Sequence, residues 1–255
     1  MDIKNVRKSV MLALLFTMVS TFSVASWAQS TAVDPYAVYT LHKMTAYVGG
    51  LEKFSLHTEN TLEEVFDSGQ RIDFDISANM IVKRPNKLYS ERVGEETGQA
   101  FFYDGATLTM LVESPSEVIY ASLPAPGTIE ELIDYARESL GIVLPVSDLV
   151  YRNAQSILMD GVTSAMYMGE TQIGEMTCSH LAFRRADIDF QVWVSTGEQP
   201  LPCKYVVTDT STPALVSIVT VMSDWHVTPT AADNAFLYVP SEEAKPTVFL
   251  PLENK

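Results

Sequence analysis

The stretch from residue 162 to residue 226 constrains the fold more than any other part of the chain. Hydrophobic and polar residues alternate along it in short runs that polar turn residues separate. A period of two places successive side chains on opposite faces, which is typical of β-strands with one buried face. The runs occupy residues 162–167, 174–184, 188–195, 202–208 and 216–225. This stretch therefore predicts an antiparallel meander. Both faces of its last strand are fairly apolar, so we expect that strand to be covered on each side.

A second group of strands is predicted in the first half of the chain. The period changes to two from Phe54, and every second residue from Ile72 to Val82 is apolar or small. Such a long alternation is typical of a strand with one half-buried face. Further short strands are predicted at residues 87–93, 99–103, 107–112 and 118–123, where Gly, Asp and Pro mark the turns. These spacings favour hairpins in one antiparallel sheet.

Three helices accompany the two strand groups. Asp34 followed by Pro35 is an N-cap and first-turn pair for a helix over 35–49. Thr128 begins a second helix that runs to about residue 140, and Ser147 is expected to cap a third that ends near Asn153. The order helix, strands, helices, strands predicts an α+β fold in which a few helices pack on one face of a curved antiparallel sheet.

The N-terminus has the features of a secretory signal peptide. Basic residues precede an apolar run over 10–19, and small residues at Ser26 and Ala28 place a cleavage site before Gln29. We therefore expect a signal peptide over residues 1–28 and a single periplasmic domain over 29–255. No later segment approaches the ~18 apolar residues of a membrane-spanning helix, and no Cys stands at the cleavage point to carry a lipid.

The charge of the chain argues against one class of partner. The formal net charge is −15, and it becomes more negative without the predicted signal peptide, which holds Lys4, Arg7 and Lys8. A strongly acidic surface repels nucleic acid and anionic membranes. We expect no nucleic-acid partner.

No residue pattern indicates catalysis or a metal site. The four histidines form no metal-binding spacing, and Cys178 and His180 share one strand face as two ligands at most, where a metal needs three or four. Nucleophile and phosphate-loop motifs are missing as well. We therefore expect a non-enzymatic protein with no cofactor and no metal, in which Cys178 and His180 are packing residues of the sheet.

The redox state of Cys178 and Cys203 stays open at this point. An exported protein reaches a compartment that permits disulfides. The two residues fall on strands separated by residues 188–195, and such strands in a flat sheet lie about 9.6 Å apart, beyond bridging reach. A bulge, or a strand that leaves the sheet, would change that distance.

Methionine is the main sign of a hydrophobic ligand. Its side chain adapts to irregular apolar partners, which suits a cavity for acyl chains, although methionines also fill ordinary cores. The expected buried stripe of the second helix and the meander add further apolar side chains. The candidate cavity residues are Met80, Met110, Leu132, Ile133, Met166, Met168, Phe190, Trp193 and Met222.

Several motifs resemble a known family. They are residues 178–184, 189–194, 200–202 and 224–225 in the meander, together with Asp34-Pro35 and residues 101–105. As a set they resemble a family of predicted bacterial periplasmic proteins with a domain of unknown function (DUF2092). Through it the chain is similar to lipoprotein carriers of the LolA/LolB/RseB-like fold. The resemblance implies an unclosed antiparallel barrel over helices, with an apolar cavity for lipid or acyl groups. The family favours a basic residue after the Pro-Leu-Pro run, where this chain has Cys203.

Three functional hypotheses follow. The first is a periplasmic carrier or binding protein for a lipid, a lipoprotein acyl chain or another amphiphile, held between the sheet and the helices near 128–153. A pocket of several hundred cubic ångströms would favour it, since ligand pockets usually have about 300–1,000 Å³. The second is an envelope sensor or assembly module that binds another protein. The third is a hydrolase that uses His180.

Overall fold

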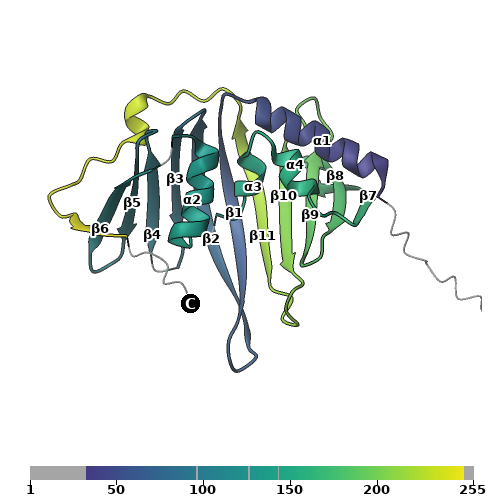
Figure 1. The fold of residues 1–255 in the computed structure, drawn as a ribbon, viewed down its shortest axis with the longest axis horizontal. Helices are drawn as coiled ribbons and strands as arrows, with labels where there is room; N and C mark the ends of the chain where they lie inside the picture. Colours follow the sequence, from purple (N-terminus) through teal and green to yellow (C-terminus); the bar gives the residue numbers. More distant parts are fainter. Residues whose placement is uncertain (1–32, 96, 126, 143, 250–255) are drawn as a thin grey trace, which may run out of the picture. The chain divides into compact units, whose positions relative to one another are not determined.

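A computed structural model describes residues 33–95, 97–125, 127–142 and 144–249 (Figure 1). The predicted signal peptide lies outside the described residues, so its cleavage stays a prediction. The described part of the chain is an α+β fold, in which one curved, unclosed sheet carries helices on one face (Figure 1).

The sheet has twelve strands in the order β12-β6-β5-β4-β3-β2-β1-β11-β10-β9-β8-β7. Its first meander comprises β1 (Lys53–Val65), β2 (Arg71–Lys83), β3 (Lys87–Val93), β4 (Gly98–Tyr103), β5 (Thr107–Glu113) and β6 (Val118–Pro124). The second comprises β7 (Ser164–Ile173), β8 (Met176–Arg184), β9 (Ile188–Ser195), β10 (Pro202–Asp209) and β11 (Ser217–His226). Every predicted strand is present.

The two meanders join where β1 pairs with β11. This ladder is antiparallel and runs from Ser55 opposite His226 to Leu62 opposite Ile218. At the far edge of the first meander, β12 (Lys245–Thr247) pairs with β6 in parallel. This strand, and a short 3-10 helix over Asp233–Phe236, were not predicted from the sequence.

Two strand predictions need correction. The first strand of the second meander runs to Ile173 rather than ending at Tyr167, because it is an edge strand whose polar side chains remain in solvent. The last strand, β11, was expected to be covered on both faces. Only Thr220 and Met222 are buried, so one face alone is fully covered.

The first two predicted helices are confirmed. Helix α1 (Pro35–Gly50) begins at Asp34, whose Oδ1 accepts a hydrogen bond from the backbone N–H of Tyr36 at 2.8 Å. Helix α2 (Ile129–Leu140) begins with a capping box between Thr128 and Glu131 and ends at Gly141, which has a left-handed φ of 64°. Side-chain caps satisfy N–H groups that the first helical turn cannot pair internally.

The third predicted helix is wrong in its extent. The helix there is only α3 (Ser147–Val150), and Ser147 is its first residue rather than the cap. A further short helix, α4 (Ala154–Met159), was not predicted. The break lies at Tyr151, whose backbone leaves the helical conformation. Its hydroxyl donates a hydrogen bond to Asp134 on α2 at 2.5 Å.

The main core lies between α1 and the second meander. Leu41 and Met44 of α1 are fully buried in one cluster with Leu181, Phe190 and Val192 of the sheet. A smaller cluster beneath α2 contains Phe101, Tyr103, Leu108 and Leu132. A third cluster contains Cys178, Trp193, Cys203 and Val206.

The two cysteines form a disulfide although β9 lies between their strands. Cys178 is paired with Ser195, the last residue of β9, and Cys203 lies where the register of β10 against β9 shifts between Pro202 and Lys204. The bulge and the end of β9 bring the two Cα atoms to 6.9 Å. A flat sheet would keep the two strands beyond bridging reach, and the bulge is the irregularity that removes this obstacle.

We predict that the Cys178→Ser/Cys203→Ser double variant loses about 2–4 kcal/mol of unfolding free energy, because the bridge restricts the unfolded chain. Urea titration followed by circular dichroism measures the loss. Wild-type protein titrated in reductant should show the same loss. A double variant as stable as oxidised wild type would contradict a stabilising role.

An apolar cavity between the sheet and helix α2

The register of the first meander brings small side chains together on the helix-covered face. Residues that lie directly opposite one another in antiparallel strands share a face. One such row runs from Thr58 on β1 through Ala78 on β2 to Arg92 on β3. The next row places Ser90 between Met80 and Phe101. Thr58, Ala78 and Ser90 are too small to reach the helix above them.

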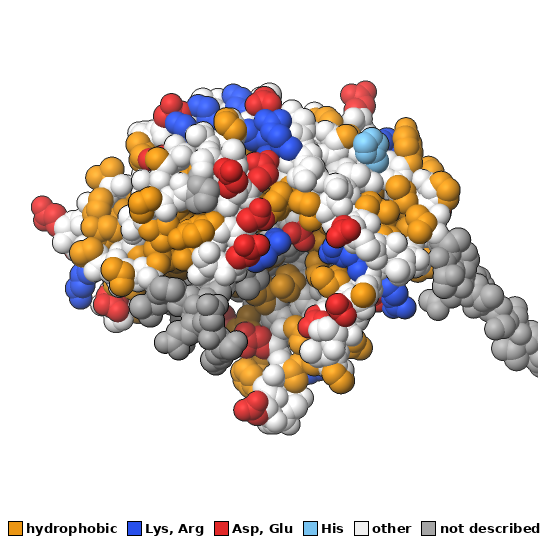
Figure 2. All heavy atoms as spheres, in the orientation of Figure 1, with side chains coloured by type: hydrophobic (Ala, Val, Ile, Leu, Met, Phe, Trp, Pro, Cys, Tyr) orange, Lys and Arg blue, Asp and Glu red, His pale blue; other side chains and the backbone are white. Residues whose placement is uncertain are grey.

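A cavity occupies the space above these residues. Helix α2 covers it with Leu132, Ile133 and Ala136, and the residues after α2 continue the cover. Beside the small side chains, the sheet contributes Leu62, Ile76, Met80, Leu88, Phe101 and Leu108. Figure 2 shows hydrophobic side chains inside a hollow near the middle of this face. The lining is almost entirely apolar.

The free space measures about 100 Å³. This is smaller than the several hundred cubic ångströms that we expected for a carrier, and smaller than the ~300–1,000 Å³ of common ligand pockets. A space of this size is enough for a small apolar group and too small for a whole acyl chain.

Thr58 and Asn60 form a buried polar network at one side of the cavity. Asn60 Nδ2 donates to Thr58 Oγ1 at 2.9 Å and to the backbone oxygen of Ile76 at 3.0 Å. Asn60 Oδ1 accepts from Thr220 Oγ1 at 2.8 Å. The network ties β1 to β2 and to β11, and it meets the requirement that buried polar groups be hydrogen-bonded.

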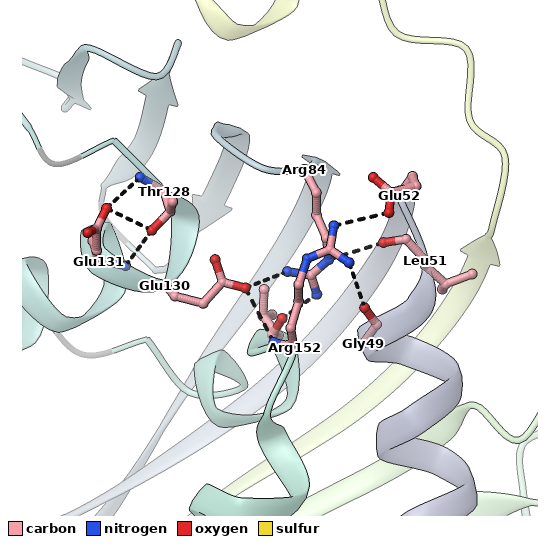
Figure 3. Close-up of polar contacts among 9 residues, drawn as sticks. Gly49, Leu51, Glu52, Arg84, Thr128, Glu130, Glu131 and Arg152 are labelled. Carbon is pink, nitrogen blue, oxygen red and sulfur yellow. Dashed lines mark hydrogen bonds and ion pairs between the residues drawn. The ribbon is translucent and has the colours of Figure 1, made fainter.

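An arginine cluster attaches α2 to the sheet and to the other helices (Figure 3). We use this name for Arg84, Arg152, Glu130 and Glu52. Arg84 has no exposed side-chain surface, and its Nη1 lies 2.9 Å from Glu130 Oε1 on α2. Its Nε donates to the backbone oxygen of Leu51 at 3.1 Å, and its Nη2 donates to that of Val150. One guanidinium therefore joins four segments of the chain.

Arg152 extends the cluster towards the end of α1. Its Nη2 lies 3.1 Å from Glu52 Oε1, and its Nη1 donates to the backbone oxygen of Gly49 at 3.3 Å (Figure 3). The chain approaches so closely here that a Cβ at Gly49 would lie 2.8 Å from the Arg152 carbonyl oxygen. Glycine at this position thus lets α1 contact the α3–α4 junction.

The electrostatics of Arg84 follow from its burial. Desolvation lowers the pKa of Arg84, and the nearby Glu130 carboxylate opposes that change. A buried charge that loses its partner destabilises a protein more than a surface ion pair does. The cluster is therefore the main polar attachment of the cavity's cover.

The structure brings some of the predicted cavity residues together. Met80, Leu132 and Ile133 line the cavity. Met222 and Met80 also line a much smaller hollow beside Trp225. Met110 packs against the cluster beneath α2, and Phe190 is buried in the main core. A ligand-binding role for each of them stays a prediction.

The other predicted residues lie away from the cavity. Met166 is half-buried on β7, and Met168 on the same strand is 56% exposed. Trp193 lies in the cluster with the disulfide. Its ring stacks on that of His180, with the two ring centres 4.1 Å apart, and Lys204 Nζ lies 4.9 Å from the centre of the Trp193 ring. Sequence reasoning missed Thr58, Ala78, Ser90 and Arg92, which only the strand register places in the lining.

His180 has the packing role that its strand position predicts. Its Nε2 lies 2.9 Å from Gln191 Oε1 in addition to the stacking on Trp193. Among the described residues, no three His, Cys, Asp or Glu side chains converge to hold a metal ion. Within the same part of the chain, no helix has the length and apolar character that a bilayer crossing requires.

We predict that Arg84→Met lowers the unfolding free energy by roughly 2–4 kcal/mol, because it removes charge-assisted hydrogen bonds and leaves two backbone oxygens without their donor. Arg137→Met is the matched control on α2. Arg137 is half exposed and pairs with Asp148, so its loss should cost at most about 1 kcal/mol. Equal losses in urea titrations of both variants would contradict the assigned role of Arg84.

Comparison with known proteins gives a family match and distant structural similarities. Residues 37–250 match the family described as "Predicted periplasmic protein (DUF2092)". No curated protein matches the chain.

Three solved structures resemble the chain at low identity. LppX, a lipoprotein of Mycobacterium tuberculosis, has 12% identity and a TM-score of 0.42, over 78% of this chain and 98% of that chain. LprF of Mycobacterium bovis has 11% identity and a TM-score of 0.48, over 78% and 97%. A LolA superfamily protein of Nitrosomonas europaea has 14% identity and a TM-score of 0.36, over 79% and 97%. The family match covers most of the chain and confirms the resemblance seen in its motifs: the chain belongs to the DUF2092 family of predicted periplasmic proteins.

Proposed function

We propose that this chain is a periplasmic, non-enzymatic binding or carrier protein for a hydrophobic ligand, such as a lipid or a lipoprotein acyl chain. The ligand is held between β1–β5 and α2. A signal peptide over residues 1–28 directs export and is cleaved, which leaves residues 29–255 as one domain. The observation that carries the proposal is the apolar cavity, whose floor is kept open by Thr58, Ala78 and Ser90.

Physical chemistry supports an apolar guest at this place. Removing apolar surface from water stabilises a complex by about 25 cal/mol per Å². Leu132 and Ile133 from above, with Met80 and Phe101 from below, offer such surface to one acyl chain. The cover is α2 with the residues that follow it, and the ion pair between Glu130 and Arg84 attaches the first turn of α2. A chain longer than the free space is admitted when α2 moves away from the sheet.

We predict that Ala78→Phe abolishes ligand retention, because the added ring fills the cavity. Protein purified from the periplasm is analysed by native mass spectrometry and by lipid extraction. Wild type should carry an extractable lipid, whereas the variant should be empty. Ser77→Phe is the matched control, since Ser77 is the neighbouring residue on the opposite face of β2 and pairs with Glu59 and Val93. Consistently empty wild-type protein that also takes up no fluorescent fatty acid would overturn the proposal.

A second candidate function is an envelope sensor or assembly module that binds another protein. The observation that favours it is the edge strand β7. In the described part of the chain β8 is the one strand that pairs with β7. Val33 and Asp34 contact the first half of its free edge, whereas Glu170 to Gln172 are exposed. An exposed edge can accept a strand from a partner.

The two functions predict different products in cells. If the module binds a protein through its edge, a photo-crosslinker at Glu170 yields one discrete protein adduct. Gln172→Pro removes it, because the N–H of Gln172 faces the free edge and proline cannot donate to an added strand. A crosslinker at Asp73, an exposed residue of β2, should yield none. Absence of an adduct from Glu170 would contradict this second function.

A further inference from the structure

The outward side of α1 carries aromatic and small side chains where an exposed helix face is normally polar. Tyr36 and Tyr39 are 49% and 57% exposed, and the helix contains no Asp or Glu, although the whole chain has 32. Helix α2 shows the usual pattern, since its exposed residues are all polar: Glu131, Asp134, Arg137, Glu138 and Ser139. A helix that is apolar on both sides normally has both sides covered. The outward side of α1 therefore suits an apolar partner.

Two further exposed apolar residues adjoin this side of the helix. Val33 precedes α1 and forms a bridge to β7, and Met168 lies on β7. The rings of Tyr36 and Tyr167 pack edge to face with their centres 4.8 Å apart, which joins α1 to the residue next to Met168. We call Val33, Tyr36, Tyr39 and Met168 the tyrosine patch. Figure 2 shows hydrophobic side chains gathered at the right of the molecule, where Figure 1 places the start of α1 beside β7. Contiguous exposed apolar residues of this kind mark interaction sites.

The charge beside the tyrosine patch suits anionic lipids. The Nζ of Lys43 lies 5.3 Å from the centre of the Tyr39 ring, and Lys43 is exposed. Two carboxylates are close in sequence. Asp34 is half-buried and accepts a hydrogen bond from the backbone N–H of Tyr36, and Glu170 is exposed further along β7. Tyrosine rings with a lysine are typical of the membrane–water interface, where the rings lie at the boundary and the charged end stays in water.

The acidic character of the whole chain restricts a membrane contact to one orientation. A formal net charge of −15 repels an anionic surface. At physiological ionic strength, however, exposed charges more than about 8 Å apart are largely screened from each other. The residues next to the membrane therefore decide whether contact is favourable. Because α1 contributes no carboxylate, repulsion at its outward side is weak.

We propose that the tyrosine patch and Lys43 dock on a phospholipid membrane that contains anionic lipids. The inference rests on the proposed function, since a carrier of a membrane lipid must contact the membrane that supplies or receives it. The place of the patch in the chain supports a membrane as its partner. Five peptide links separate Val33 from Ala28, the last residue of the proposed signal peptide, and five links span at most about 18 Å. The patch is thus close to the bilayer while the signal peptide is inserted.

Flotation with vesicles of phosphatidylethanolamine and phosphatidylglycerol tests the proposal. Wild type should float with these vesicles, and Tyr36→Ser/Tyr39→Ser should bind them roughly tenfold more weakly, because it removes two amphipathic rings. Lys43→Gln should weaken binding about fivefold, the effect of one lysine at an anionic surface, and should not change binding to phosphatidylcholine alone. Leu237→Ser/Val239→Ser is the matched control. It removes exposed apolar residues of the C-terminal segment and should float like wild type.

A tryptophan reporter tests the same contact without removing a side chain from the patch. Brominated acyl chains in the vesicles should quench the added fluorescence of Tyr39→Trp and leave that of Val239→Trp unchanged. Wild type that does not float would overturn the inference, and so would flotation that persists in Tyr36→Ser/Tyr39→Ser or equal quenching of both reporters. If wild type does not float and a photo-crosslinker at Tyr39 captures a protein in cells, the patch belongs to a protein partner. Lipid extraction of the same wild-type preparation tests the proposed function separately, so a protein that carries lipid but does not float would overturn the docking alone.

Discussion

The antiparallel ladder between β1 and β11 is the interaction on which the rest of the structure depends. Each meander forms from hairpins that are local in the sequence, but β1 and β11 are separated by more than 150 residues at Asn60 and Thr220. Their side chains are hydrogen-bonded to each other inside the sheet. Without this ladder the main core, which joins Phe54 and Leu56 of β1 to the second meander, would be divided between two separate sheets.

The cavity results from two independent constraints. Small side chains at Ala78 and Ser90 lower the floor, and the contacts of Arg84 fix one end of the cover. Both are needed, because a close-packed interior leaves few voids larger than a water molecule. If α2 could settle onto the sheet, its apolar side chains would fill this space. The arginine cluster attaches α2 to neighbouring segments, and those segments then set the distance between α2 and the sheet.

The sequence predicted the strands and helix starts, which depend on residues close together in the chain. It did not predict the disulfide or the cavity lining, which depend on how the strands are paired. Alternation and turn residues located every strand of both meanders, and Asp34 and Thr128 located two helix starts. The bridge between Cys178 and Cys203 could not be decided, because it depends on a bulge in β10 that no local pattern marks. Methionine was an ambiguous signal, since strand position alone does not say whether a side chain such as Met168 faces a cavity or solvent. Only the register placed Arg92 in the lining.

The hollow lowers the folding stability of the protein, and this loss bears on its function. The apolar side chains that line the hollow lack the close contacts of a packed core, which lowers the stability of the fold. A larger apolar residue at Ala78 or Ser90 would recover this stability, because both lie on a face that is already covered. Because the chain has small residues at these two positions, it is less stable than a variant with larger apolar residues there. A bound apolar group restores the missing contacts, so ligand binding and folding stability must rise together in this protein.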